Sequence, residues 1–192
     1  MGRLYYTKIF LIIIFLLSIS AAVYASSAAA HALPGSPFVV TDVHDGDTIS
    51  IKVESFAGFP LRTERLRLIG IDAPELKQET WGRKAKKHLK KLISESDWVV
   101  NVEFDVDKRD KYGRLLGYLW NRHTGVLINE KMTADGYAVL FTFPPNVRYV
   151  DRFIEAEKKA RAAKLGIWEQ GGLKQSPVEW RRQNPSNYSE RH

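Results

Sequence analysis

The stretch that decides the fold is Arg65–Glu75, which reads RLRLIGIDAPE. With the two-residue period of a β-strand, Leu66 and Leu68 face one way, and the alternate positions from Arg67 to Ile71 face the other. Because both sides carry apolar residues, this pattern predicts a strand that is covered on both faces. A cation at position 67 of such a strand needs a partner.

The strand is predicted to end at the corner formed by residues 72–75. Pro74 fixes its own φ and biases Ala73 away from the helical region. The corner therefore holds the carboxylates of Asp72 and Glu75 close to the cation at Arg67, an arrangement that indicates a site. The structural alternative is an arginine at a strand edge followed by an ordinary turn aspartate, because short motifs often occur by chance.

The 192 residues are enough for one domain with extensions. Arg3 and Lys8 precede an apolar run, Ile9–Ile19, and a region of small residues, which is typical of a secretory signal peptide over residues 1–30. An uncleaved anchor is the alternative, since the apolar stretch up to Ala25 reaches the lower limit of a membrane span. We expect an exported protein, secreted or in the cell envelope or periplasm, that has no stable membrane association once the leader is cleaved. A monomer is the default expectation.

The chain contains no cysteine, which excludes disulfides, thiolate zinc sites and cysteine nucleophiles. The fold must therefore be stabilised by packing, or by a bound ligand or metal. Without Arg3 and Lys8 of the leader, the formal net charge of +7 falls to +5. This charge suits an anionic polymer, although solubility alone would also explain it.

The rest of the chain predicts an α+β domain. The Asp-Gly pair at 45–46 lies between two β-rich runs and indicates a hairpin. The expected strands cover residues 38–43, 48–53, the stretch before Asp72, 98–104 and 114–120, and the expected helices cover 79–94, 126–134 and 149–164. This order matches a five-stranded OB-type Greek-key β-barrel with three α-helices. The predicted divisions are a linker at 31–36, the domain at 37–168, and a basic, disordered tail at 169–192.

Six polar residues in this scheme lack a simple structural reason: Asp45, Asp47, Arg67, Asp72, Glu75 and Arg114. Clustered carboxylates without histidine or cysteine indicate a hard cation, calcium or magnesium. Two arginines beside such a cation indicate that the bound group is itself an anion, because a guanidinium fits phosphate oxygens bidentately. Together these residues predict phosphodiester hydrolysis.

Three motifs, in this order and spacing, resemble the staphylococcal nuclease (thermonuclease) family: Asp45–Thr48, Arg67–Glu75 and Asp110–Arg114. The resemblance continues through Asn129 and Gly136 to Trp168. It implies an OB-type barrel and a calcium-dependent endonuclease that acts on DNA and RNA and leaves 3′-phosphate ends.

The resemblance also implies roles for individual residues. The metal ligands would be Asp47, Asp72 and the backbone carbonyl of Ala73. Glu75 would act as general base or would position the attacking water, and Arg67 and Arg114 would hold the phosphate and stabilise the transition state. The residues matching the substrate pocket are Lys111, Tyr112, Phe141 and Phe143.

Four features of the sequence depart from the family pattern. Phe141 and Phe143 stand where the best-known member has tyrosines, which keeps base stacking but removes hydroxyl contacts to a terminal phosphate. The stretch Leu76–Thr80 is shorter than the corresponding lysine-rich loop, and Ala73 replaces a threonine. The alternatives to a nuclease are a non-catalytic nucleic-acid-binding barrel and an envelope-anchored structural protein that uses its lysine-rich helix on anionic surfaces.

Overall fold

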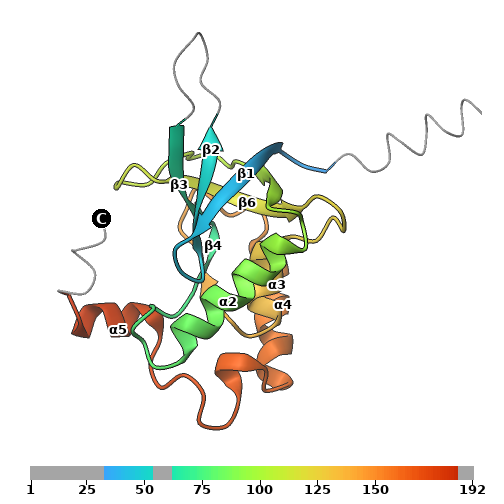
Figure 1. Ribbon diagram of the computed structural model, residues 1–192. Helices are drawn as coiled ribbons and strands as arrows, with labels where there is room; N and C mark the ends of the chain where they lie inside the picture. Colours follow the sequence, from blue (N-terminus) through green and yellow to red (C-terminus); the bar gives the residue numbers. More distant parts are fainter. Residues whose placement is uncertain (1–32, 54–61, 186–192) are drawn as a thin grey trace, which may run out of the picture. The chain divides into compact units, whose positions relative to one another are not determined.

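The computed structural model describes residues 33–53 and 62–185, and the labels used here are those of Figure 1. Its elements are β1 (Ser36–Val43), β2 (Thr48–Val53), β3 (Arg62–Leu68), β4 (Gly70–Asp72), α2 (Trp81–Ser94), β5 (Val99–Glu103), β6 (Leu115–Asn121), α3 (Ile128–Ala134), β7 (Val139–Phe141), α4 (Val150–Ala162), a 3-10 turn η1 (Gly166–Trp168) and α5 (Pro177–Gln183). The leader predicted over residues 1–30 lies outside the described residues. Within the described residues, every helix is too short or too polar to span a membrane.

Five strands close into a barrel in the order β1-β2-β3-β6-β5. β1 pairs with two strands of the barrel. Its residues 36–39 pair with β5 and its residues 40–43 pair with β2, with an irregularity between Val40 and Asp42. β3 pairs antiparallel with β2 and parallel with β6, which completes the closure. The predicted α+β class and five-stranded barrel are confirmed.

The barrel interior is filled by the inward-facing apolar residues of its strands and by one face of α2. Ile49, Leu66 and Leu119 are fully buried, as are Ala85 and Leu89 of the helix. Burying one large aliphatic side chain contributes roughly 1.5–3 kcal/mol, so this shared core fixes α2 against the barrel. Only residues 76–80 separate the helix from the corner at 72–75. The first turn of the helix packs closely against that corner, since a Cβ at Gly82 would lie 1.9 Å from the backbone O of Glu75.

Gly70 moves the chain out of the barrel. Its φ is +83°, a left-handed conformation that glycine adopts readily, and a Cβ there would lie 2.2 Å from the ring of Phe153. The strand alternation breaks at this point, so Ile71 joins the barrel core while Ile69 packs in a second cluster with Phe153. The prediction that Ile69 and Ile71 share one side is wrong for this reason. The next strand, β4, pairs with β7 outside the barrel.

The described residues contain four α-helices, where three were predicted. The additional helix, α5, begins at Pro177 and is capped by Ser176, whose side chain accepts a hydrogen bond from the backbone of Glu179. The prediction of a disordered tail over 169–192 is therefore wrong for part of that segment. Figure 1 shows α5 beside the connection between β4 and α2.

Candidate active site

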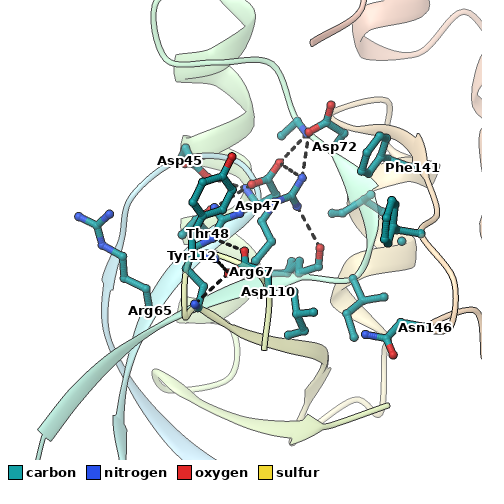
Figure 2. A pocket seen from close by; sticks show the side chains of 18 of the residues that line it. Asp45, Asp47, Thr48, Arg65, Arg67, Asp72, Asp110, Tyr112, Phe141 and Asn146 are labelled. Atoms are coloured by element: carbon teal, nitrogen blue, oxygen red, sulfur yellow. Dashed lines mark hydrogen bonds and ion pairs between the residues drawn. The ribbon is translucent and has the colours of Figure 1, made fainter. Parts of the chain in front are cut away.

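One cavity of about 830 Å³ lies where the β1–β2 turn, the end of β3, the corner after β4 and two further loops meet. All ten residues assigned to the site from the sequence line it: Asp47, Arg67, Asp72, Ala73, Glu75, Lys111, Tyr112, Arg114, Phe141 and Phe143. Figure 2 shows how several of these side chains converge on the cavity from different elements. The structure thus brings together residues that are up to 96 positions apart in the sequence.

Asp47, in the turn between β1 and β2, is fixed by hydrogen bonds to neighbouring residues. Its backbone N donates to Asp45 Oδ1 at 2.9 Å, and its backbone O accepts from Leu68 N at 2.8 Å. Its Oδ2 accepts from the backbone N of Ala73 at 2.7 Å, which joins the turn to the corner after β4. The side chain is 9% exposed, so its charge requires a partner.

Arg67 supplies that partner and binds the second carboxylate with the same atom. Its Nη2 lies 3.1 Å from Asp47 Oδ2 and 2.9 Å from Asp72 Oδ1, and these contacts are among the dashed lines in Figure 2. Its Nη1 donates to the backbone O of Leu68 at 2.9 Å. Burial lowers the pKa of Arg67, but Asp47 and Asp72 outweigh it and the pKa is raised overall, so the guanidinium stays charged. Arg67 therefore lies between two carboxylates in the cavity, and its role in the reaction stays a prediction.

Three carboxyl groups near Arg67 have raised pKa values: Asp45, Asp72 and Glu75. Burial raises the pKa of Asp72, which is fully buried, and Arg67 opposes this effect. Burial also raises the pKa of Glu75 and of Asp45, and in Asp45 repulsion from Asp47 adds to it. Several carboxylates close together in a sheltered place favour either protonation or a bound cation.

Arg114 is oriented by the loop that precedes β6. Its Nε donates to Asp110 Oδ2 at 2.7 Å, and its backbone N donates to Asp110 Oδ1 at 3.0 Å. Its guanidinium carbon lies 5.6 Å from the centroid of the Tyr112 ring. Arg114 therefore lines the same cavity as Asp47 and Asp72, but its ion pair is with Asp110.

Aromatic and basic side chains border the open part of the cavity. Tyr112, Phe141 and Phe143 are 46%, 42% and 76% exposed. Lys111 lies beside them, with its Nζ 5.1 Å from the centroid of the Tyr112 ring. Exposed rings next to a cation are the surface that single-stranded nucleic acids use for stacking and backbone contact.

The acidic group fits a hard cation better than a soft one. Asp47 and Asp72 each place a carboxylate oxygen against the same nitrogen, Arg67 Nη2. The chain has no cysteine that could supply a thiolate ligand. Among residues 33–53 and 62–185, no three histidine, cysteine or acidic side chains are placed to hold a metal together. A cation here would therefore depend on two carboxylates supplemented by backbone oxygen or water, which calcium and magnesium accept and zinc does not favour.

A family model described as "Staphylococcal nuclease homologue" matches residues 65–170, more than half of the chain. The chain belongs to the staphylococcal nuclease homologue family. This result confirms the resemblance that its motifs indicated, and the matched range of the family contains Arg67, Asp72, Glu75 and Arg114.

Curated relatives agree with membership of the staphylococcal nuclease homologue family. The chain is 36% identical over 140 residues to the thermonuclease of Staphylococcus intermedius, covering 70% of this chain and 77% of the relative. It is 32% identical over 136 residues to the thermonuclease of Staphylococcus hyicus, covering 68% and 75%. It is also 33% identical over 135 residues to endonuclease YncB of Bacillus subtilis (strain 168), covering 67% of this chain but 59% of that protein.

One residue at the centre of the site was not predicted. Arg181 of α5 donates from Nη2 to Asp72 Oδ2 at 2.8 Å and from Nη1 to Glu75 Oε1 at 3.0 Å. A sequence signal for its helix exists, because Ser176-Pro177-Val178-Glu179 has the pattern of a capping box with proline at the first helical position. No local pattern connects that helix to Asp72. Asp110, as the partner of Arg114, was also missed.

Proposed function

We propose that this protein is a calcium-dependent endonuclease that hydrolyses phosphodiester bonds in DNA and RNA without sequence preference and leaves 3′-phosphate ends. Membership of the family and the relatives named thermonuclease and endonuclease make it a nuclease. The observation that carries the finer proposal is the convergence of Asp47 and Asp72 on Arg67 in one cavity with Glu75 and Arg114.

The carboxylates would hold the cation, together with the backbone carbonyl of Ala73. A bound calcium ion would supply positive charge to a phosphate oxygen. Glu75 sits at the rim of this group, where a carboxylate can take a proton from an attacking water. Its pKa is raised by burial, which makes it a stronger base than a surface glutamate.

The arginines would bind the phosphate itself. Arg67 lines the cavity from β3 and Arg114 from the loop before β6, so a phosphate between them would meet guanidinium groups from two directions. Charge that builds on the phosphate oxygens in the transition state is stabilised by such fixed donors. Arg67 is fixed by the two aspartates and Arg114 by Asp110, so neither must reorganise during the reaction.

The exposed rings account for the proposed absence of sequence preference. Tyr112, Phe141 and Phe143 offer faces on which any base can stack, and Lys111 can contact the backbone. None of these groups reads the hydrogen-bonding edge of a base in a way that would select one of the four. Substrate should therefore be recognised as single-stranded backbone with unstacked bases.

The test is cleavage of labelled single-stranded DNA, double-stranded DNA and RNA by the wild type, Glu75→Gln and Arg114→Ala, with calcium or with chelator. Glu155→Gln, an exposed carboxylate on α4, is the matched control. We expect Glu75→Gln to lower kcat by roughly 10²–10⁴ and Arg114→Ala by roughly 10²–10³, with circular dichroism unchanged. The products should carry 5′-hydroxyl ends, which a kinase can label directly. They should also carry 3′-phosphate ends, which a phosphatase removes.

Two results would oppose the proposal. Full cleavage in chelator would show that the reaction does not need calcium, and products with 3′-hydroxyl ends would contradict the proposed 3′-phosphate ends. Unchanged turnover in either variant would refute the role given to that residue.

Export and the monomeric state are also proposals. The signal peptide predicted over residues 1–30, with its two basic residues, apolar run and small residues, supports export. Mass spectrometry of the protein recovered from culture medium and from membranes would locate the N-terminus. Recovery of the uncut chain from membranes alone would favour the anchor instead. Light scattering of the purified protein tests the monomer.

A further inference from the structure

The C-terminal segment places a third guanidinium in the acidic group of the site. Arg181 binds Asp72 with both terminal nitrogens, Nη1 to Oδ1 at 3.1 Å and Nη2 to Oδ2 at 2.8 Å. Its Nη1 also donates to Glu75 Oε1 at 3.0 Å. One side chain thus contacts both the proposed metal ligand and the proposed general base. The contact with Asp72 joins residues 109 positions apart.

This contact is presented by an anchored segment. The side chain of Gln78, which is fully buried, donates to the backbone O of Gln175 at 2.8 Å. Pro177 at the start of α5 is buried, and the capping box of Ser176 and Glu179 fixes the first turn of the helix. The segment is therefore docked at two places, at Gln78 and at the carboxylates.

The same glutamine also touches the site. Gln78 Oε1 accepts from the backbone N of Glu75 at 3.2 Å, while Gln78 Nε2 binds the C-terminal segment. The loop that carries the general base and the segment that carries Arg181 consequently share one buried side chain. Movement of α5 away from the site would therefore also alter the position of Glu75.

A guanidinium and a divalent cation cannot both use Asp72 in this way. Asp72 Oδ1 already accepts from Arg67 and Arg181, and Oδ2 accepts from Arg181. A metal ion that ligates this carboxylate must displace one of these donors, and it is repelled by any guanidinium left beside it. Arg67 is held in a covered strand, whereas Arg181 belongs to a short helix near the end of the chain. Arg181 is the donor that is easier to displace.

We propose that Arg181 is a built-in competitor of the divalent cation. In the metal-free protein it neutralises Asp72 and Glu75 and holds α5 over the site, and cation binding releases it and opens the site to substrate. The buried charge of Asp72 then has a partner in both states. This inference rests on the proposed function, because it takes the competing cation to be the calcium of that proposal.

Calcium binding, measured by calorimetry on the full-length chain after removal of metal, tests the competition directly. The variants are Arg181→Gln, Arg181→Lys, which keeps the charge but loses the fork, and Arg182→Gln, the exposed neighbour on the same helix, as matched control. Asp72→Asn reports whether the calcium binds at this site. We expect Arg181→Gln to bind calcium about 5- to 150-fold more tightly than the wild type, the usual range for coupled binding. Arg181→Lys should lie between them, and Arg182→Gln should match the wild type.

Hydrogen exchange of the amides of α5 gives a readout that does not depend on activity. In the wild type, saturating calcium should speed exchange over residues 177–183, whereas in Arg181→Gln exchange should be fast with or without calcium. Equal calcium affinities of Arg181→Gln and wild type, or α5 amides that stay protected at saturating calcium, would overturn the inference and leave the nuclease proposal intact. A large loss of kcat in Arg181→Gln at saturating calcium would also overturn it, by making Arg181 a substrate ligand. Absence of calcium binding in every variant would overturn both proposals.

Discussion

Asp110 and Arg114 are joined by an ion pair of 2.7 Å between Arg114 Nε and Asp110 Oδ2. The other oxygen of Asp110 accepts hydrogen bonds from the backbone N of Tyr112 at 2.9 Å and of Arg114 at 3.0 Å. One carboxylate therefore shapes the loop before β6 and fixes the plane of the arginine that the proposed function aims at the phosphate. Asp110 acts through Arg114 and is a positioning residue.

Replacing Asp110 by asparagine should lower kcat by roughly 10- to 100-fold, because a small misplacement of a catalytic group has an effect of this size. The asparagine keeps the shape of the loop but removes the charge that holds Arg114. Combined with Arg114→Ala, the substitution should cause little further loss, since both act through one group. Kinetics of the single and double variants measure this, with thermal unfolding as the check on folding. Fully multiplicative losses in the double variant would contradict the positioning role.

Asn129 should be a major source of stability between the barrel and α3. Its Oδ1 accepts from Leu119 N at 2.9 Å, and its Nδ2 donates to Ile69 O at 2.9 Å and to Gly117 O at 3.3 Å, all in a buried place. Asn129→Ala removes the partner of Leu119 N and of Ile69 O, at about 1–3 kcal/mol for each group stranded. Gly117 O keeps a hydrogen bond from Ile69 N at 3.1 Å. We expect the free energy of unfolding in urea to fall by roughly 2–5 kcal/mol with an unchanged slope. A loss below about 1 kcal/mol would show that water replaces the side chain.

Much of the site was predictable because its residues are arranged by local rules. The turn at Asp47, the strand that carries Arg67 and the corner at Asp72 each follow from strand period or turn chemistry. Their meeting in space follows once the strands close a barrel. The contact of Arg181 with Asp72 follows from no local rule, since neither its charge nor its helix indicates where the C-terminal segment docks.

The error at Ile71 has a different origin. Strand alternation places Ile69 and Ile71 on one side, and only the left-handed conformation of Gly70 separates them. A glycine inside an apolar run signals a possible break, but the close approach of Phe153 that requires it comes from α4, more than 80 residues later. The outcome depends on tertiary packing, which a pattern of residues does not contain.

Gly70 and Gly113 form a matched pair for separating backbone strain from crowding. Their φ angles are +83° and +81°, but a Cβ at Gly70 would lie 2.2 Å from Phe153 Cε2, whereas nothing lies within 4 Å of one at Gly113. Alanine at Gly113 should cost about 1–2 kcal/mol of backbone strain. Alanine at Gly70 should cost that amount and about 1–3 kcal/mol more for overpacking. Urea unfolding of both variants measures the difference, and equal losses would mean that Phe153 moves aside freely.

Asp135 should make the stability of the fold depend on pH in the acid range. His88 Nε2 and Lys131 Nζ contact its carboxylate at 2.8 and 2.7 Å. Burial raises the pKa of Asp135, but these hydrogen bonds outweigh burial and the pKa lies below its usual value of 3.8. Because the folded pKa is the lower one, the ionised group stabilises the fold above the unfolded pKa, and this stabilisation is lost as the pH falls through the folded pKa. The difference in unfolding free energy between wild type and Asp135→Asn, measured in urea at a series of pH values, should therefore be constant between about pH 5 and 6 and shrink below about pH 4. A difference that grows on acidification would mean that the carboxylate is better stabilised in its protonated form.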